Sequence, residues 1–278
     1  MAGKVPLIIE TGSYPVSRVL ITGASGRIGG YLRTRLRRPG RTLRLLDTVP
    51  AEAAAEGEDV EIVPGSVTDA AVLAEACSDV DAVIHLAGHP REHTWQEILA
   101  VNVDGTRTVL EAARRCEVPR VILASSGHVA GFRENKGILP ADSSPRPDTY
   151  YGFGKAVLEA LGSLYHSRFG MDVLCVRIGA CFPDPGNAHG MELWLSPDDA
   201  GRLFEACLAA PEPGYRIVWG VSANTRGRCS PREAGELGYR AVDDSERFAG
   251  TLSPDDDSTS VYLGGTLFVT TELGVPMR

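Results

Sequence analysis

The sequence has no long hydrophobic run, and this absence argues against one class of protein. No apolar stretch in its 278 residues approaches the roughly 20 that span a bilayer as a helix. The apolar stretch near the start, in MAGKVPLIIETGSYP, is too short for the core of a signal peptide and ends at Glu10. We therefore expect no membrane span, and we interpret residues 1–17 as a short N-terminal extension or an extra edge strand.

Patterned cysteines and a basic surplus are also missing. The six cysteines are scattered, with no C-x-x-C spacing and no paired histidines near them. We therefore expect neither a disulfide framework nor a metal site, and small buried thiols in a reducing cytoplasm. The formal charge of −8 argues against general nucleic-acid binding. Arginines crowd positions 33–44, and we interpret this stretch as a solvated helix face.

Short β-rich apolar runs alternate with helical patterns over the first two thirds of the chain. The runs are RVLIT (18–22), TLRLLD (42–47), VEIV (60–63), DAVIHLA (81–87), RVILAS (120–125) and DVLCVRIG (172–179). Helical patterns lie near 27–38, 69–77, 95–115 and 149–169, whereas 48–59 is expected to be irregular. Runs that are apolar at both parities predict strands covered on both faces. The fold class is therefore α/β, a Rossmann-type doubly wound parallel sheet.

The alternation dissolves after about residue 180. A capped helix is expected at 196–208, a strand at 215–220 and a second cap at 230–237, while 253–260 is expected to be a polar loop. We therefore divide the chain into a nucleotide-binding core, residues 18–180, and a small substrate-binding lobe, residues 181–278. The lobe is expected to be interleaved with the core rather than independent.

A glycine motif follows the first predicted strand. In VLITGASGRIGGYL, Gly23, Gly26 and Gly29 stand at the entry to a helix, where glycines permit a tight turn and the close approach of a pyrophosphate. Asp47 ends the second strand, where a carboxylate binds the adenosine ribose and repels a 2′-phosphate. NAD is thus the predicted cofactor and NADP the less favoured one, with Arg27 and the arginine-rich stretch as the groups that could offset Asp47.

A tyrosine and a lysine share a helix face further along the chain. At about 100° per residue, Lys155 lies about 40° round from Tyr151 but about 140° round from Tyr150. A nearby ammonium favours the ionised form of a phenol, so Tyr151 is the candidate base and Tyr150 a packing residue. The spacing alone is also typical of an amphipathic helix with a packed tyrosine and a solvated lysine, so the remaining motifs decide.

Taken in order, GASGRIG, Asp47, HLAG (85–88), AVNVDGT, ASSGHVAG (124–131) and YGFGK resemble the extended short-chain dehydrogenase/reductase superfamily. Stretches after residue 177, among them RIGACFPDP and LGGTLFV, look like the uronate dehydrogenases, which oxidise the C1 hemiacetal of a uronate with NAD. The resemblance implies that Tyr151 is the acid/base, that Lys155 lowers its pKa, and that Ser126 hydrogen-bonds the reacting oxygen.

The same resemblance implies a wider set of cofactor contacts. Ser66 and Val67 would flank the adenine, although SVTD equally well predicts a helix N-terminus there. Asn102 would support a relay to Lys155, or would simply be a polar helix residue satisfied by backbone. The full set implied at the cofactor, beyond the glycines and Asp47, is Arg27, Ile28, Ser66, Val67, Leu86, Ala87, Gly88, Asn102, Tyr151, Lys155, Ile178 and Cys181.

On the substrate side the chain departs from the uronate dehydrogenase pattern. Pro90 replaces a serine, Gly127 replaces an asparagine beside the retained His128, and His189 stands where the arginine for the sugar carboxylate is expected. An arginine offers a bidentate, permanently charged fork that histidine lacks. We therefore expect simple hexuronates to be poor substrates, unless another cation replaces the arginine; the candidates are Arg91, His93 and Arg133.

The sequence leaves three functions to weigh. The leading one is an NAD-dependent dehydrogenase of a sugar-like hydroxyl, acting on a small molecule as a homodimer or larger homo-oligomer. A second is a sugar or nucleotide-sugar epimerase or dehydratase that recycles a tightly bound NAD. The third is a non-catalytic NAD(P)-sensing protein, which the intact tyrosine–lysine pair disfavours.

Overall fold

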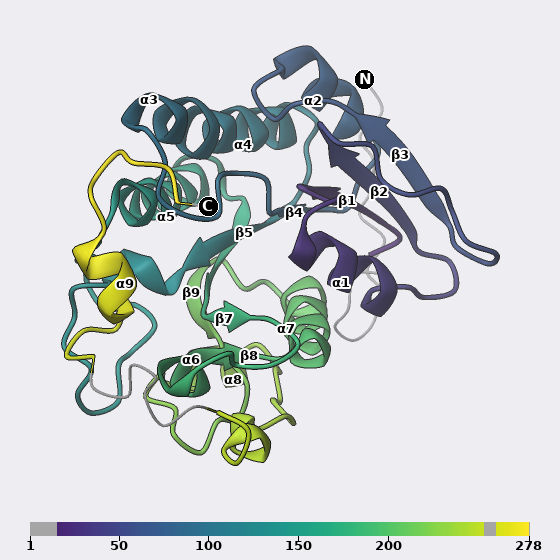
Figure 1. Cartoon of the computed structure of the whole chain (residues 1–278). Coiled ribbons are helices and arrows are strands. Elements are labelled where there is room, and N and C mark those ends of the chain that lie inside the picture. Colours follow the sequence, from purple (N-terminus) through teal and green to yellow (C-terminus); the bar gives the residue numbers. More distant parts are fainter. Residues whose placement is uncertain (1–15, 253–259, 278) are drawn as a thin grey trace, which may run out of the picture.

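A single parallel sheet organises the computed structural model, which describes residues 16–252 and 260–277 (Figure 1). Its seven strands run in the order β3-β2-β1-β4-β5-β6-β9. They are β1 (Arg18–Thr22), β2 (Thr42–Asp47), β3 (Val60–Pro64), β4 (Ala82–His85), β5 (Arg120–Ser126), β6 (Asp172–Ile178) and β9 (Tyr215–Gly220). Every neighbouring pair is parallel. The predicted Rossmann-type fold class is confirmed, while residues 1–15 of the expected N-terminal extension lie outside the described residues.

Helices cover both faces of this sheet. One face packs against α1 (Arg27–Arg35) and α7 (Pro197–Ala209), and the other against α2 (Ala70–Ala76), α4 (Gly105–Arg115) and α5 (Tyr150–Phe169). Alternate residues of β1 feed the two cores: Val19 and Ile21 join the first, and Leu20 joins the second. This two-sided burial is why the predicted strands read as continuous apolar runs.

The helix predicted over 95–115 is continuous in the chain but changes its winding. It begins as α3 (Trp95–Glu97), continues as the π-helix η1 (Ile98–Asp104) and becomes α4. Single π-turns inside helices often occur at functional sites. Here the wider turn carries Asn102, which is buried, toward the loop that follows β4.

The last third of the chain contributes both to the sheet and to a group of short elements beside it. Helix α7 and strand β9, which both lie beyond the predicted boundary at residue 180, belong to the main layers. Ser196 accepts a hydrogen bond from the Asp199 N–H, which confirms the predicted cap. The short elements are β7 (Ala180–Cys181), α6 (Ala188–Leu193), β8 (Trp194–Leu195), α8 (Arg232–Glu236), η3 (Ser245–Phe248) and α9 (Gly265–Thr270). Another short element, η2 (Gly127–Ala130), directly follows β5 in the middle of the chain.

The chain end folds back toward earlier parts of the chain. After α9, residues 271–277 run back toward the start of α5, as the yellow trace in Figure 1 shows. None of the helices in the described part of the chain combines the length and apolar character needed to cross a membrane.

Candidate active site

The turn between β1 and α1 forms a cradle of backbone. Gly23 has a φ of +70°, and a Cβ on it would lie 2.6 Å from the Ala87 amide nitrogen. A Cβ on Gly29 would lie 2.4 Å from the Ala24 carbonyl oxygen, so only glycine lets the helix pack here. Helix α1 has no side-chain cap and no acidic residue in its first turn. Its N–H groups and dipole therefore suit a pyrophosphate, as the sequence predicts.

Asp47 closes this cradle at the end of β2. Its carboxylate accepts hydrogen bonds from the backbone N–H of Ser25 at 3.0 Å and of Val49 at 3.1 Å. These bonds fix the side chain beside the glycine turn, where a ribose hydroxyl of a dinucleotide would lie. The position fits NAD and disfavours a 2′-phosphate.

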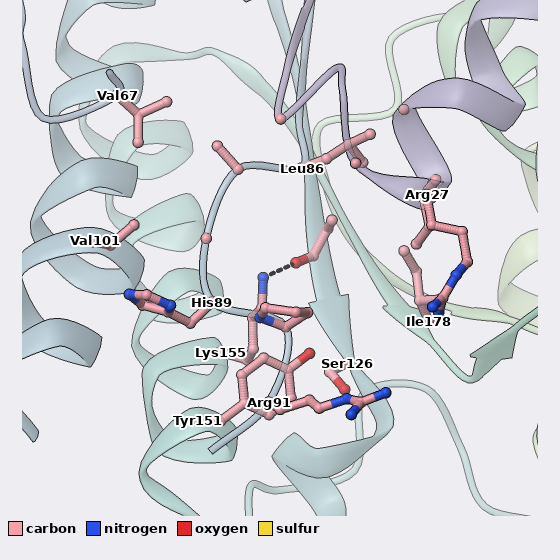
Figure 2. A pocket seen from close by; sticks show the side chains of 18 of the residues that line it. Arg27, Val67, Leu86, His89, Arg91, Val101, Ser126, Tyr151, Lys155 and Ile178 are labelled. Carbon is pink, nitrogen blue, oxygen red and sulfur yellow. Dashed lines mark hydrogen bonds between the residues drawn. The ribbon is translucent and has the colours of Figure 1, made fainter. Parts of the chain in front are cut away.

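The arginines that could offset Asp47 are engaged elsewhere. The Arg27 guanidinium lies 4.2 Å from the ring centroid of Phe182, on the Ile178 side of the cavity (Figure 2). Arg33 pairs with Glu58 and Arg44 with Glu61. The remaining members of the cluster pair with Asp198, Glu58 or Glu205: Arg35, Arg37, Arg38 and Arg41. The stretch is a set of ion pairs rather than a phosphate site.

One cavity of about 790 Å³ gathers most of the predicted site residues. Its lining includes the glycine cradle, Asp47, Ser66 and Val67, the loop after β4, and the catalytic group. Four predicted residues are not among the lining: Asn102, Gly127, His128 and His189. The residues expected at a dinucleotide thus line one cavity, whereas Asn102 and three of the five expected at the substrate do not line it. One of these three, His128, still packs edge-on against Tyr151, with ring centroids 5.8 Å apart.

Tyr151 and Lys155 lie on the buried face of α5 beside the end of β5. Their side chains and Ser126 face the same part of the cavity (Figure 2). The Lys155 ammonium donates to the Ala124 carbonyl at 2.7 Å and lies 5.9 Å from the centre of the Tyr151 ring. Tyr150 instead packs edge-on against Trp95, with ring centroids 5.0 Å apart. The helix-face prediction separates the two tyrosines correctly.

Burial dominates the electrostatics of this pair. It raises the pKa of Tyr151 to about 12, against the opposing effect of a hydrogen bond with Ser126. It also lowers the pKa of Lys155 to about 8. The structure does not show the predicted lowering of the Tyr151 pKa by Lys155, because the low-dielectric site that both groups share disfavours the charged form of each.

A buried ion pair fixes the distance between α5 and β5. One turn beyond Lys155, Glu159 receives two hydrogen bonds of 2.8 Å from Arg177 and one of 2.6 Å from the Ser125 hydroxyl. All three side chains are buried. Because Ser125 adjoins Ser126, this network sets Ser126 opposite helix α5. No local pattern in the sequence predicts this network, since the three residues lie on separate elements.

Asn102 stabilises the loop after β4 instead of lining the cavity. Its Oδ1 accepts from the His89 N–H at 2.8 Å, and its Nδ2 donates to the His89 carbonyl at 3.0 Å. Both bonds go to backbone, so the simpler of the two sequence interpretations holds. The loop that they fix carries Gly88, Pro90 and Arg91 into the site.

The substrate side differs most from expectation. His189 does not reach the cavity, because its Nε2 pairs with the Leu263 carbonyl at 3.0 Å and its ring covers Gly265. His128 pairs with Asp148 at 2.7 Å and stacks on Phe268 of α9, with ring centroids 3.7 Å apart. A Cβ on Gly127 would approach the Trp219 ring at 3.7 Å and the Ile178 carbonyl oxygen at 3.9 Å. Both histidines contact residues near the C-terminus, Leu263 and Phe268, and no local sequence pattern predicts these contacts.

Sequence reasoning missed one acidic residue that joins the site together. Glu92 is fully buried, and its two carboxylate oxygens accept from the Tyr151 N–H at 2.9 Å and the Gly274 N–H at 2.8 Å. Its carbonyl accepts from the Met277 N–H at 3.1 Å. Glu92 therefore connects the first turn of the catalytic helix to the chain end, and Met277 lines the cavity.

Arg91 brings a cation to the catalytic end of the cavity. Figure 2 shows its side chain passing Tyr151 toward Ser126, whereas His89 points the other way, toward Val101. Arg91 is one of the residues that the sequence analysis suggests as a replacement for the expected arginine, but its position could not be predicted from the sequence. Together, a dinucleotide cradle and a serine, tyrosine and lysine at its catalytic end define a Rossmann-type, nucleotide-dependent oxidoreductase.

Comparison with known proteins narrows this class. Residues 19–188 match the model of the NAD dependent epimerase/dehydratase family. Uronate dehydrogenase from Pseudomonas syringae pv. tomato is 39% identical over 95% of this chain and 98% of its own. NAD-dependent glucose-6-phosphate dehydrogenase from Haloferax volcanii is 35% identical, over 86% and 98% of the two chains.

Comparison with solved structures finds the same kind of relative. The crystal structure of uronate dehydrogenase from Agrobacterium tumefaciens has a TM-score of 0.85 and 35% identity, covering 92% of this chain and 97% of that one. A mutant of that enzyme complexed with NAD has a TM-score of 0.82 and 33% identity, covering 92% and 98%. This chain belongs to the NAD-dependent epimerase/dehydratase family.

Proposed function

We propose that this protein is an NAD-dependent dehydrogenase that oxidises a hydroxyl group of a sugar. The observation that carries the proposal is the buried group of Ser126, Tyr151 and Lys155 at one end of the glycine-lined cavity. The cradle fits NAD on its own geometry, through the uncapped α1 terminus and the fixed Asp47 carboxylate. Relatives whose names include uronate, glucose-6-phosphate and L-arabinose dehydrogenases support a sugar as substrate.

The reaction requires a base beside a hydride acceptor. Bound NAD supplies the acceptor for the hydride that leaves the carbinol carbon. The Tyr151 oxygen takes the hydroxyl proton, and Ser126 orients the reacting oxygen by hydrogen bonding. The Lys155 ammonium stabilises the negative charge that Tyr151 carries before it takes that proton. Because burial raises the pKa of Tyr151 to about 12 and lowers that of Lys155 to about 8, turnover should rise with pH up to about 8, above which the Lys155 ammonium loses its proton.

The substrate, we propose, carries an anionic group that Arg91 binds. The sequence alone predicts poor turnover of simple hexuronates, because His189 replaces the expected arginine. The structure supports the alternative in which another cation takes over, since Arg91 extends to the catalytic end and His189 does not reach it. A planar guanidinium can bind a carboxylate or a phosphate through two parallel hydrogen bonds.

A substrate panel tests both parts of this proposal. NADH formation is measured with glucuronate, galacturonate, glucose 6-phosphate and glucose. We expect kcat/KM to be at least about tenfold higher for one of the charged sugars than for glucose, corresponding to about 1.4 kcal/mol. Arg91→Gln should abolish that preference and leave glucose turnover within about threefold. Best activity on neutral sugars would reject the anion site, and product formation without net NADH would favour the recycling epimerase or dehydratase.

We also propose a homo-oligomer that works in the cytoplasm. All six cysteines are free thiols, five of them buried, as in proteins from reducing compartments. Leu164 and Phe169 expose 55% and 48% of their surface on α5, where a second copy could cover them. Light scattering that shows a monomer at micromolar concentration would contradict the oligomer.

A further inference from the structure

Three side chains with metal-ligating atoms converge at the rim of the cavity. His89, His93 and Glu97 recur at every fourth position, and their nearest ligand atoms all lie within 4.8 Å of one another. Within residues 16–252 and 260–277, these are the residues that form a group of three His, Cys, Asp or Glu side chains close enough to share one metal ion. His89 and His93 also line the cavity. The sequence-based expectation of no metal site rested on the cysteines and overlooked this spacing.

Contacts from neighbouring residues hold the three groups in place. The backbone of His89 is fixed on both sides by the Asn102 amide, as described above. His93 Nδ1 lies 2.5 Å from Glu97 Oε2, and the Thr94 hydroxyl donates to the same carboxylate oxygen. The two imidazole rings stack with centroids 4.0 Å apart. Hydrogen bonds from the surroundings that orient ligands in this way are typical of metal sites.

The donor set selects a class of ion. Two imidazoles and one carboxylate suit borderline transition metals such as Zn²⁺, Co²⁺ or Ni²⁺ rather than Ca²⁺ or Mg²⁺, which prefer oxygen ligands alone. For metal–ligand distances of about 2.0–2.2 Å, donor atoms as far apart as 4.8 Å must close around the ion, and the His93 and Glu97 atoms, 2.5 Å apart, must separate.

The surrounding charges do not oppose a cation. Figure 2 shows His89 directed toward Val101 and the Arg91 guanidinium directed toward Ser126, on the other side of Tyr151. Glu97 provides a carboxylate on the same side as the two histidines. Three protein ligands also leave coordination positions for water or for an oxygen atom of a molecule in the cavity.

We propose that His89, His93 and Glu97 bind one divalent transition-metal ion at the mouth of the cavity, with an open coordination position facing the cavity. Binding at this site does not depend on the proposed reaction, since the three residues are separate from the Ser126, Tyr151 and Lys155 group. The two proposals can therefore fail independently.

The experiment is calorimetric titration of Zn²⁺ into the full chain, with any affinity tag removed and adventitious metal stripped by a chelator. We expect one ion per chain with a micromolar Kd. His93→Gln and Glu97→Gln should each weaken binding at least about tenfold, as loss of a direct ligand must exceed the 10–100-fold effects known for outer contacts. Co²⁺ should give visible absorption that disappears in His93→Gln.

Two control variants make the result specific. His166→Gln removes an imidazole that bonds the Met171 carbonyl far along α5, and Cys116→Ser removes a partly exposed thiol. Both should bind Zn²⁺ as the unaltered chain does, and all variants should keep the same circular dichroism spectrum. The proposal is overturned if the chain binds no Zn²⁺, if His93→Gln binds it normally, or if either control variant removes binding.

Discussion

The two ends of the cavity are built in different ways. The cofactor end consists of turns that directly follow β1, β2 and β4, and its key groups are backbone atoms and glycines. The substrate end consists of side chains from distant segments, and Glu92 contacts Gly274 across 182 positions of the chain. The first kind of site can be recognised from a short stretch of sequence. The second kind depends on how the whole chain folds.

Gly23→Ala should have the largest effect and be specific to the cofactor end. A methyl group there meets the Ala87 backbone and requires a positive φ, so both loops must move. We expect NAD affinity to fall about 100-fold, or about 2.7 kcal/mol, by calorimetry. Gly30→Ala is the matched control, because nothing lies within 4 Å of its added methyl. Equal losses in the two variants would show that the cradle is not the cause.

Lys155 lies between the two ends of the cavity, and Lys155→Met should change the free energy of unfolding in a pH-dependent way. The pKa of Lys155 is lowered to about 8 from 10.5, so between these values the unfolded chain binds more protons and stability rises with pH. Below pH 8 the buried ammonium costs about 3 kcal/mol. Urea unfolding without NAD should therefore find Lys155→Met more stable by about 2–3 kcal/mol at pH 7, with the difference vanishing near pH 10.5. Lys136→Met, at an exposed lysine, should show no such dependence on pH.

Glu92→Gln should damage the substrate end and spare the cofactor end. An amide cannot accept at both positions, so the N–H of Tyr151 or of Gly274 loses its partner. The cost of about 1.5–3 kcal/mol should lower kcat about tenfold or more by displacing Tyr151 and Met277. The Kd for NAD should stay within about twofold. Glu134→Gln, at an exposed ion pair with Lys136, is the control. A parallel loss of NAD affinity would mean that the two ends are not separable.

The smallest effect concerns the adenosine ribose. We expect kcat/KM to favour NAD over NADP at least about tenfold, because the Asp47 carboxylate repels a 2′-phosphate and the nearby arginines are already paired. Asp47→Asn should narrow the ratio. Equal efficiency with both cofactors in the unaltered enzyme would show that the arginine-rich stretch controls the choice.

This contrast explains which features of the fold and site could be predicted from the sequence. The strands, the glycine cradle, Asp47 and the choice of Tyr151 over Tyr150 were all predictable, because each depends on a local pattern or on helix geometry. The position of His189 was not predictable, because its ring hydrogen-bonds the carbonyl of Leu263, a residue far along the chain. Glu92 and Met277 were invisible, because their partners are brought near only by the return of the chain end.

The lysine effect shows a further limit. A sequence motif predicts which side chains lie close together. The direction of a pKa shift depends in addition on how deeply those side chains are buried. Tyr151 and Lys155 both lose stabilisation of their charged forms in the same apolar site. Burial of this depth cannot be read from the four-residue spacing.

The central claim is that the Tyr151 oxygen is the base of the reaction. Steady-state turnover of Tyr151→Phe and Tyr150→Phe, each with NAD affinity measured on the same preparation, tests it most directly. Tyr151→Phe should lower kcat at least about 1,000-fold with the Kd for NAD within a few-fold, because only the titratable oxygen is lost. Tyr150→Phe should change kcat by less than about threefold. An active Tyr151→Phe beside an inactive Tyr150→Phe would contradict the assignment.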